Sequence, residues 1–377
     1  MADQQGSIQV SATARRLRVR LADGLDGEFT AMWLRDNRPE DRDAHSGQRL
    51  VDITDLPSDP TIESARIDGQ SLLVAWTDGK TTAYDLGWVG RQCRDPLADR
   101  PELQPRLWLE GAGMDGATDF AWCAFESLAR DDSARLDWLT RLAVDGIAFL
   151  SGVPTADGAI LDAMRHAGRV AETNYGLLFD VRSVVRPENL AYSDFGLGLH
   201  TDNPYRDPVP GFQALHVLVS SPDGGDSLLG DGFAIAEHLR QIDPESFRVL
   251  STTPVPFLYR SAGAELYSEK PLIRLDVRGR VIAVHYNNRS IAPLHLAADD
   301  SDAFYAAYRR FVGLLRDPRF QVSLRLGDGD LMVFDNQRTL HGRTAFSSAR
   351  HPRHLQGCYL TRDSVLSEAA LLRRRLA

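Results

Sequence analysis

The stretch LMVFDNQRTLHGR, residues 331–343, carries the pattern on which the fold assignment rests. Four apolar residues, 331–334, predict a buried strand, and the polar run 335–338 predicts a tight turn. The chain then continues into a second predicted strand, which carries His341. A strand that turns and continues into a second strand favours a β fold.

Short strand-like runs continue on both sides of this stretch. They are predicted at residues 212–219, 254–259, 273–277, 281–286, 320–324, 331–334 and 354–360. Helical spacing interrupts them at 234–242 and 302–315 only, and a basic helix is predicted at 364–376. Many short strands with few helices predict a mainly β domain, either a barrel or a double-sheet jelly roll, with flanking helices.

The N-terminal part also alternates short strands with turns. Its strand-like runs are residues 8–10, 17–21, 29–34, 72–76 and 81–86. The sequence TDGK at 77–80 contains Asp-Gly, which predicts a hairpin turn between the last two runs. These elements predict a small antiparallel β domain.

The boundary between the two domains is predicted where periodicity is lost. Residues 94–121 begin rich in Pro, Asp and Arg, which predicts a linker. Helices at 133–144 and 158–171 follow. We therefore expect a β domain at 1–93 and a second domain at 122–377.

The composition indicates a globular protein that acts on a small molecule. The chain has 377 residues, more than one core usually supports, and 43% of them are hydrophobic. A net charge of −9 argues against general binding to nucleic acid or anionic membranes, because both require a basic surface. Neither a GxSxG elbow, a P-loop nor a GxGxxG motif after a strand is found, which argues against a serine hydrolase and a nucleotide-binding protein.

The three cysteines, Cys93, Cys123 and Cys358, form no CxxC pair and are odd in number. They predict neither a disulfide framework nor a thiolate zinc site, and they fit a reducing cytoplasm. Neither a signal peptide nor a run of apolar residues long enough for a membrane span is found, so we expect an unprocessed cytoplasmic protein.

The candidate metal ligands are His200, Asp202 and His341. His200 and Asp202 stand two residues apart in GLHTDNP, 198–204, and a strand would direct both side chains to one face. Sheet pairing can bring the distant His341 beside them. Two imidazoles and one carboxylate make the facial triad that suits non-haem iron(II) and leaves coordination positions open for a cosubstrate and dioxygen.

Two further residues predict a 2-oxoglutarate site. Arg353 follows His341 on what we expect to be the adjoining strand, and a guanidinium is suited to hold the distal carboxylate bidentately. Ser227, in DGGDS at 223–227, offers a hydroxyl to the same carboxylate; the alternative is a plain Gly-Gly turn.

Several motifs taken together resemble the γ-butyrobetaine dioxygenase group within the taurine dioxygenase-like iron(II)/2-oxoglutarate oxygenases. They are MWLRDN (32–37), LHTDNP (199–204), GGDSLLGDGF (224–233), FDNQRTLHGR (334–343) and RHLQGCY (353–359). The resemblance implies a double-stranded β-helix catalytic domain and a homodimer. It also implies hydroxylation coupled to conversion of 2-oxoglutarate and O2 to succinate and CO2. We also expect Leu215 to contact 2-oxoglutarate.

The sequence departs from this group in the N-terminal domain. Relatives carry a zinc site there, but Arg38, Glu40 and Asp43 stand where thiolates would be expected. We therefore expect the structural zinc to be absent.

The resemblance also implies a cage for a trimethylammonium group. That cation has no N–H, so aromatic faces must attract it. The positions matching the cage are Tyr175, Phe179, Tyr192 and Tyr359, and Phe179 replaces a tryptophan of relatives.

The anionic end of the substrate is expected at Asn189, Asn203, Asn287 and Arg289. Asn203 replaces a tyrosine of relatives, and strand alternation would put Asn287 and Arg289 on one face. A guanidinium suits a highly charged tetrahedral anion, although a surface salt bridge is the alternative for Arg289. The resemblance is thereby closest to the 2-trimethylaminoethylphosphonate dioxygenase branch, which implies hydroxylation at the carbon bearing phosphorus. The alternatives are a γ-butyrobetaine hydroxylase making carnitine and a non-catalytic binding protein of the same fold.

Overall fold

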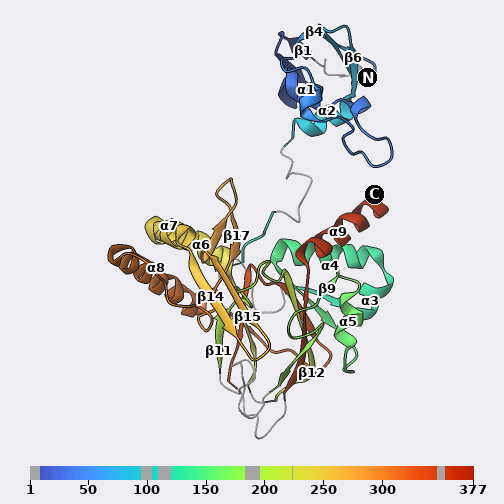
Figure 1. Ribbon diagram of the computed structural model, residues 1–377. Coiled ribbons are helices and arrows are strands. Elements are labelled where there is room, and N and C mark those ends of the chain that lie inside the picture. Colours follow the sequence, from blue (N-terminus) through green and yellow to red (C-terminus); the bar gives the residue numbers. More distant parts are fainter. Residues whose placement is uncertain (1–8, 95–103, 109–119, 183–195, 223, 346–352) are drawn as a thin grey trace. The chain divides into compact units, whose positions relative to one another are not determined.

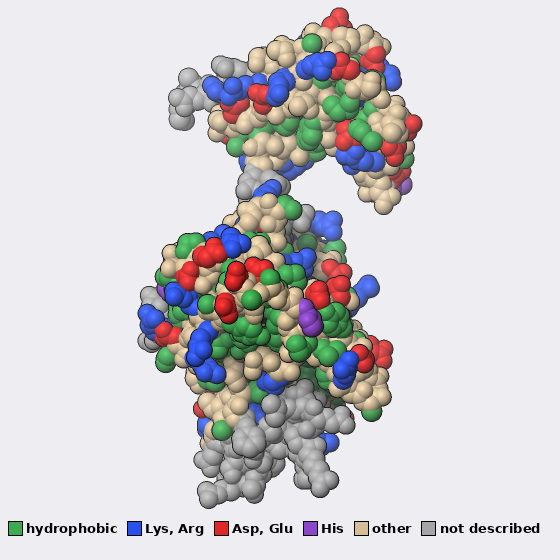
Figure 2. Space-filling view, turned by 60° about the vertical axis from the view of Figure 1, so that its left-hand side comes forward, with side chains coloured by type: hydrophobic (Ala, Val, Ile, Leu, Met, Phe, Trp, Pro, Cys, Tyr) green, Lys and Arg blue, Asp and Glu red, His purple; other side chains and the backbone are tan. Residues whose placement is uncertain are grey.

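The computed structural model describes residues 9–94, 104–108, 120–182, 196–222, 224–345 and 353–377. The chain divides into two compact units, Met1–Pro101 and Glu102–Ala377 (Figure 1). Acidic and basic side chains are interspersed on the face of each unit that Figure 2 shows. Within the described ranges, no helix is both long enough and apolar enough to cross a membrane.

The N-terminal unit contains two three-stranded antiparallel sheets, each followed by a short helix. The elements are β1 (Gln9–Ala12), β2 (Arg16–Arg20), β3 (Asp26–Thr30), α1 (Ala31–Asp36), β4 (Ile62–Asp68), β5 (Ser71–Trp76), β6 (Thr81–Asp85) and α2 (Leu86–Gln92). Alternate residues of β2 and β5 are buried, which is the period expected of strands with one face on a core. The predicted hairpin turn joins β5 to β6, and Gly79 there has a φ of +80°.

The strand predicted at 29–34 is wrong beyond Thr30. The Thr30 hydroxyl accepts a hydrogen bond from the backbone N–H of Trp33 at 3.1 Å, so the threonine caps α1. Capping satisfies a backbone donor at the start of the helix that a strand would have directed sideways.

An ion pair and hydrogen bonds hold the segment after α1, where the resemblance would have placed zinc ligands. The Arg38 guanidinium donates two hydrogen bonds of 2.8 Å to the Asp41 carboxylate. The Asp43 carboxylate accepts hydrogen bonds from the backbone N–H and the hydroxyl of Ser46, each at 2.7 Å. These contacts cross-link the loop locally; the absence of zinc stays a prediction.

The second unit is built around a seven-stranded and a four-stranded sheet. The larger sheet has the order β10-β21-β12-β19-β8-β7, with β9 also paired to β21; the smaller has the order β11-β20-β13-β18. The strands of the larger sheet are β7 (Ala121–Ala124), β8 (Ile147–Ser151), β9 (Val170–Ala171), β10 (Phe179–Arg182), β12 (Phe212–Val219), β19 (Leu331–Asp335) and β21 (His354–Leu360). Those of the smaller sheet are β11 (Leu197–His200), β13 (Ser227–Asp231), β18 (Val322–Leu324) and β20 (Thr339–Arg343).

The remaining elements cover the outer faces of these sheets. Two hairpins, β14 (Val255–Arg260) with β15 (Glu265–Lys270) and β16 (Ile273–Leu275) with β17 (Val281–Val284), pack with α6 (Gly232–Ile242), α7 (Pro244–Thr252) and α8 (Ala298–Arg316). The helices α3 (Phe125–Arg130), α4 (Asp132–Asp145), α5 (Ala159–Met164) and α9 (Arg362–Leu376) lie on the other side, against the larger sheet (Figure 1).

Apolar side chains fill the space between the two sheets. Val217 and Met332 from the larger sheet meet Leu229 and Leu324 from the smaller one in a single buried cluster. The strands of both sheets pair antiparallel except for β7, which runs parallel to β8 at one edge. Two such sheets facing each other over this core confirm the predicted mainly β jelly roll.

Three expectations for this unit differ from the structure. The helix α7 was not predicted, although Asp243 caps it and Pro244 stands at its first position. The helix predicted at 158–171 ends at Met164. Part of the predicted linker packs on the second unit: the Arg106 guanidinium bonds the buried Asp145 carboxylate at 2.8 Å, and Trp108 Nε1–H donates to the Asp145 carbonyl.

Candidate active site

A cavity of about 350 Å³ opens among the strands of the second unit. Strands from both sheets line it, together with β14 and the loops after β11 and β17. It contains every described residue that the sequence predicts for the site: His200, Asp202, His341, Ser227, Leu215, Arg353, Tyr175, Phe179, Asn203, Asn287, Arg289 and Tyr359. Asn189 and Tyr192 lie outside the described residues.

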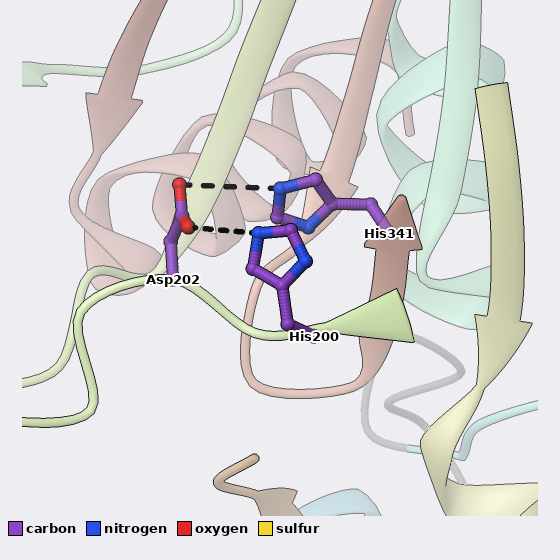
Figure 3. A group of neighbouring side chains, drawn as sticks. All are labelled: His200, Asp202 and His341. Atoms are coloured by element: carbon purple, nitrogen blue, oxygen red, sulfur yellow. Dashed lines mark ion pairs between the residues drawn. The ribbon is translucent and has the colours of Figure 1, made fainter. Parts of the chain in front are cut away.

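The three predicted metal ligands converge in this cavity (Figure 3). Strand pairing sets His200 directly opposite His341, and their rings lie 4.3 Å apart. The Asp202 carboxylate lies 3.4 Å from His200 Nε2 and 4.0 Å from His341 Nε2. One potential ligand atom from each residue lies within 4.8 Å of the others, so one ion can bind all three.

Strand alternation does not direct Asp202 toward His200, so that expectation was wrong. The strand β11 ends at His200, so strand alternation does not set the direction of Asp202. The fully buried Asn336 does so instead: its Oδ1 accepts from the Asp202 backbone N–H at 2.7 Å, and its Nδ2 donates to the Asp202 carbonyl at 2.9 Å. Sequence reasoning identified the turn that contains Asn336 but not this role.

Hydrogen bonds and burial orient these ligands and shift two of their pKa values. His200 Nδ1–H donates to the Gly198 carbonyl at 2.9 Å, which orients the ring with Nε2 toward Asp202. Burial, followed by repulsion from His200, lowers the pKa of His341 to about 3. Burial raises the pKa of Asp202, but its hydrogen bond with His200 and the electrostatic effect of the nearby His341 outweigh burial and lower that pKa.

Tyr359 adds an outer contact to the same carboxylate. Its hydroxyl donates to Asp202 Oδ2 at 3.0 Å, which restricts rotation of the carboxylate. Two imidazoles and one carboxylate on one side of an otherwise open cavity are the donor set of a non-haem iron(II) site. The residues present therefore fit iron(II).

Two arginines that line the cavity, Arg343 and Arg353, come from opposite sheets. Arg353 directly precedes β21 in the larger sheet, whereas His341 lies on β20 in the smaller one, so the expectation of adjoining strands was wrong. Burial, and then the nearby Arg343, lower the pKa of Arg353 to about 10. Ser227 is buried and pairs with Arg343 across β13 and β20. Sequence reasoning missed Arg343, which was quoted only as part of a motif.

Aromatic rings form a continuous wall along the cavity. Tyr359 lies 5.2 Å from Phe179, and Phe179 lies 6.2 Å from Tyr175. Tyr175 meets Tyr259 at 6.2 Å, and Tyr259 stacks on Tyr205 at 5.0 Å. Sequence reasoning missed Tyr205 and Tyr259, although Tyr205 immediately follows the LHTDNP motif.

Gly357 provides the space for one ring of this wall. It pairs with Phe179 across β21 and β10, and a Cβ at position 357 would come within 2.5 Å of the Phe179 ring. A side chain there would displace the ring, because packed interiors leave no room for such an approach.

Asn287 and Arg289 come from a turn after β17 and not from a strand as expected. Asn287 Nδ2 donates to the Thr201 carbonyl, and its Oδ1 accepts from the Arg289 backbone N–H, each at 3.2 Å. The amide thus ties the Arg289 turn to the loop of the metal ligands. The amide nitrogen and the amide oxygen of Asn287 therefore both form hydrogen bonds within the protein.

The Arg289 guanidinium makes neither a hydrogen bond nor an ion pair among the described residues. The surface salt bridge considered as its alternative is therefore not found there. Neighbouring atoms displace part of its water, which lowers the pKa of Arg289, while the charge of Asp202 acts in the opposite direction. The same guanidinium helps lower the pKa of His341, so its charge lies near the metal ligands.

Comparison with known proteins identifies the family. Residues 116–359 match the family described as "Taurine catabolism dioxygenase TauD, TfdA family". The chain belongs to this family. It is 38% identical over 360 residues to a gamma-butyrobetaine dioxygenase from Pseudomonas sp. (strain AK-1), covering 94% of this chain and 92% of the relative. It is 30% identical over 366 residues to a mitochondrial trimethyllysine dioxygenase from Gallus gallus, covering 94% and 86%.

A solved structure of asparagine oxygenase in complex with Fe(II), (2S,3S)-3-hydroxyasparagine and succinate covers 63% of this chain and 83% of that chain, with a TM-score of 0.48 and 18% identity. As a TauD/TfdA member, the protein is a dioxygenase that uses iron(II) and 2-oxoglutarate. The predicted enzyme class is confirmed, and the alternative of a non-catalytic binding protein is not supported.

Proposed function

We propose that this dioxygenase hydroxylates 2-(trimethylamino)ethylphosphonate at the carbon bearing phosphorus. The products would be 1-hydroxy-2-(trimethylamino)ethylphosphonate, succinate and CO2. The observation that carries the proposal is the Arg289 guanidinium, which lines the same cavity as the aromatic wall and has no partner among the described residues.

The aromatic wall supports a quaternary ammonium group as the cationic end. Such a cation cannot donate a hydrogen bond, whereas ring faces attract it through their quadrupoles. Tyr175, Phe179 and Tyr359 supply three neighbouring rings. The names of the two relatives, gamma-butyrobetaine and trimethyllysine dioxygenase, are consistent with substrates of this class.

Arg289 supports a phosphonate as the anionic end. A phosphonate presents three oxygens and more charge than a carboxylate, so it gains more from the guanidinium fork. Asn203 adds a second donor, because its buried Nδ2 has no partner among the described residues. We assign these two side chains to the anion, and we assign Asn287 the task of holding Arg289.

The protein's contribution to the reaction is positioning. When bound, iron(II) with 2-oxoglutarate supplies oxygen activation coupled to decarboxylation. Arg353 and Ser227 would hold the cosubstrate, while the aromatic wall and Arg289 hold the two ends of the substrate, so that one carbon lies nearest the metal. The separation between the two clamps therefore decides which carbon is hydroxylated.

Hydroxylation of γ-butyrobetaine to carnitine is the second candidate. It is favoured by 38% identity over nearly the whole chain to a gamma-butyrobetaine dioxygenase. The two candidates share the cationic end and differ in the anion, so Arg289 and Asn203 are the residues that must discriminate between them.

A side-by-side assay separates the candidates. Purified protein with iron(II) and 2-oxoglutarate is given each substrate, and succinate formation and product mass are measured. We expect a higher kcat/KM with the phosphonate; stronger turnover of γ-butyrobetaine would transfer the assignment to the second candidate. The homodimer implied by the resemblance stays a prediction, which sedimentation of the same sample can test.

A further inference from the structure

Tyr205 links the cationic and anionic sides of the cavity through its hydroxyl. Its O–H donates to Asn203 Oδ1 at 2.5 Å, and the Tyr175 hydroxyl lies 3.3 Å from the Tyr205 hydroxyl oxygen. The ring is buried and stacks on Tyr259, so the phenol has little freedom to turn away. Nothing in the motifs around the metal ligands assigns Tyr205 a role.

We propose that Tyr205 is a positioning residue for the anionic end of the substrate: its hydroxyl orients the Asn203 amide so that the NH2 group donates to that anion. The inference rests on the proposed function, and it adds the residue that gives Asn203 its direction.

The direction of the hydrogen bonds follows from the groups available. A phenol hydroxyl can donate one hydrogen bond and also accept one. With Tyr175 donating to Tyr205, the single proton of Tyr205 is left for Asn203 Oδ1. An amide whose oxygen is engaged in this way must present its NH2 group on the other side.

The NH2 group of Asn203 lacks an acceptor. Asn203 is buried, lines the cavity, and its Nδ2 finds no partner among the described residues. Buried donors are rarely left unpaired, so a ligand with an acceptor oxygen is the natural partner. Without the Tyr205 hydroxyl, the Asn203 amide could rotate and turn its oxygen toward the ligand. The amide oxygen would repel an anionic ligand.

The backbone fixes where this donor stands relative to the metal. Asn203 directly follows the metal ligand Asp202 and has a φ of +54°, in the left-handed region that asparagine tolerates better than most residues. Because Asn203 is the next residue after Asp202, its amide must lie close to the metal ligands. Tyr205 then bridges this amide to Tyr175 of the aromatic wall and sets the separation of the two clamps.

The test is Tyr205→Phe, which removes the hydroxyl and keeps the stacked ring. Binding is measured by calorimetry on the full chain with three probes: 2-(trimethylamino)ethylphosphonate, γ-butyrobetaine and choline, which carries the same cation without an anionic group. We expect Kd to rise at least fivefold for whichever zwitterion the native protein binds better, and to stay within twofold for choline. Equal weakening of all three probes, or no change for the zwitterion, would overturn the inference.

Two further variants make the test specific. In an Asn203→Ala background, Tyr205→Phe should change Kd by less than twofold, because the amide it orients is gone; additive losses would contradict the inference. Tyr267→Phe is the control, since the Tyr267 hydroxyl donates to the Glu269 carboxylate and neither residue lines the cavity. If the native protein binds neither zwitterion better than choline, the proposed function fails before Tyr205 is tested.

Discussion

The metal side and the recognition side of the cavity are built differently. The two histidines are set by paired strands, and Asp202 is held by two backbone hydrogen bonds from Asn336. The recognition side depends on the turn that carries Arg289 and on side-chain contacts such as the Tyr205 to Asn203 hydrogen bond. The two histidines are thus fixed by strand pairing, whereas the side proposed to hold the anion depends on a turn and on side-chain hydrogen bonds.

Removal of a metal ligand should have the largest effect. We expect His341→Ala to reduce substrate-dependent succinate formation to below about a thousandth, since a metal ion contributes several kcal/mol to the stabilisation of the transition state. His295→Ala is the control, because His295 is exposed and does not line the cavity. Intact activity in His341→Ala would refute the assignment of the triad.

Loss of the backbone clamp should come next. We expect Asn336→Ala to weaken iron(II) affinity by about tenfold to a hundredfold, the range seen when residues that orient metal ligands are lost. Activity measured against iron(II) concentration checks this. Gln337 lies in the same turn, but its side chain donates to the Val209 carbonyl and not to Asp202, so Gln337→Ala should leave the iron dependence unchanged. A similar shift in both variants would assign the effect to the turn as a whole.

A smaller and more selective effect is expected on the recognition side. Arg289→Ala should raise KM for the phosphonate by roughly tenfold or more, because hydrogen bonds to charged groups contribute about 1.5–3 kcal/mol. The increase in KM should be much smaller for a carboxylate analogue. The kcat for conversion of 2-oxoglutarate to succinate should be retained. Arg289→Lys keeps the positive charge but loses the two-pronged guanidinium, so its KM for the phosphonate should lie between those of the native protein and Arg289→Ala. Equal increases in KM for the phosphonate and the carboxylate would refute the role of Arg289.

The smallest effect concerns the strand that carries Phe179. Asp180 accepts hydrogen bonds from His354 Nε2 at 2.7 Å and Gln356 Nε2 at 3.2 Å. Burial raises the pKa of Asp180, but these hydrogen bonds outweigh it and lower that pKa. A carboxyl whose pKa is lowered by folding stabilises the folded state at pH values above its pKa in the unfolded chain. This stabilisation is lost as the pH falls through its pKa in the folded protein.

We therefore expect Asp180→Asn to lower the free energy of unfolding at pH 7 by about 0.5–1 kcal/mol, a small amount because the carboxylate is partly exposed. The difference should shrink as the pH falls below about 4. Urea unfolding at pH 7 and pH 3 checks this. Asp162→Asn, which breaks an exposed pair with Arg165, is the control with a smaller expected change. An equal loss at both pH values would exclude the electrostatic explanation.

The sequence predicted the strands best where the local pattern was unambiguous. The runs 212–219 and 354–360 match β12 and β21, because both strands are central and apolar along most of their length. It failed where a polar residue changed the local structure, as at Thr30, or where a strand is too exposed to show an apolar pattern, as in β15. Capping and edge positions are decided by hydrogen bonds that local hydrophobicity does not reveal.

The sequence by itself determined the residue types of the metal site, the class of chemistry and the presence of aromatic and cationic side chains at the predicted cavity positions. Only the tertiary structure decided that Asn336 holds Asp202, that Asn287 is used within the protein, and that Tyr205 and Tyr259 join the aromatic wall. The reason is physical: each of these roles depends on a partner brought close by strand pairing or packing across the fold. Spacing along the chain records which groups are present, and the fold decides which of them remain free to bind.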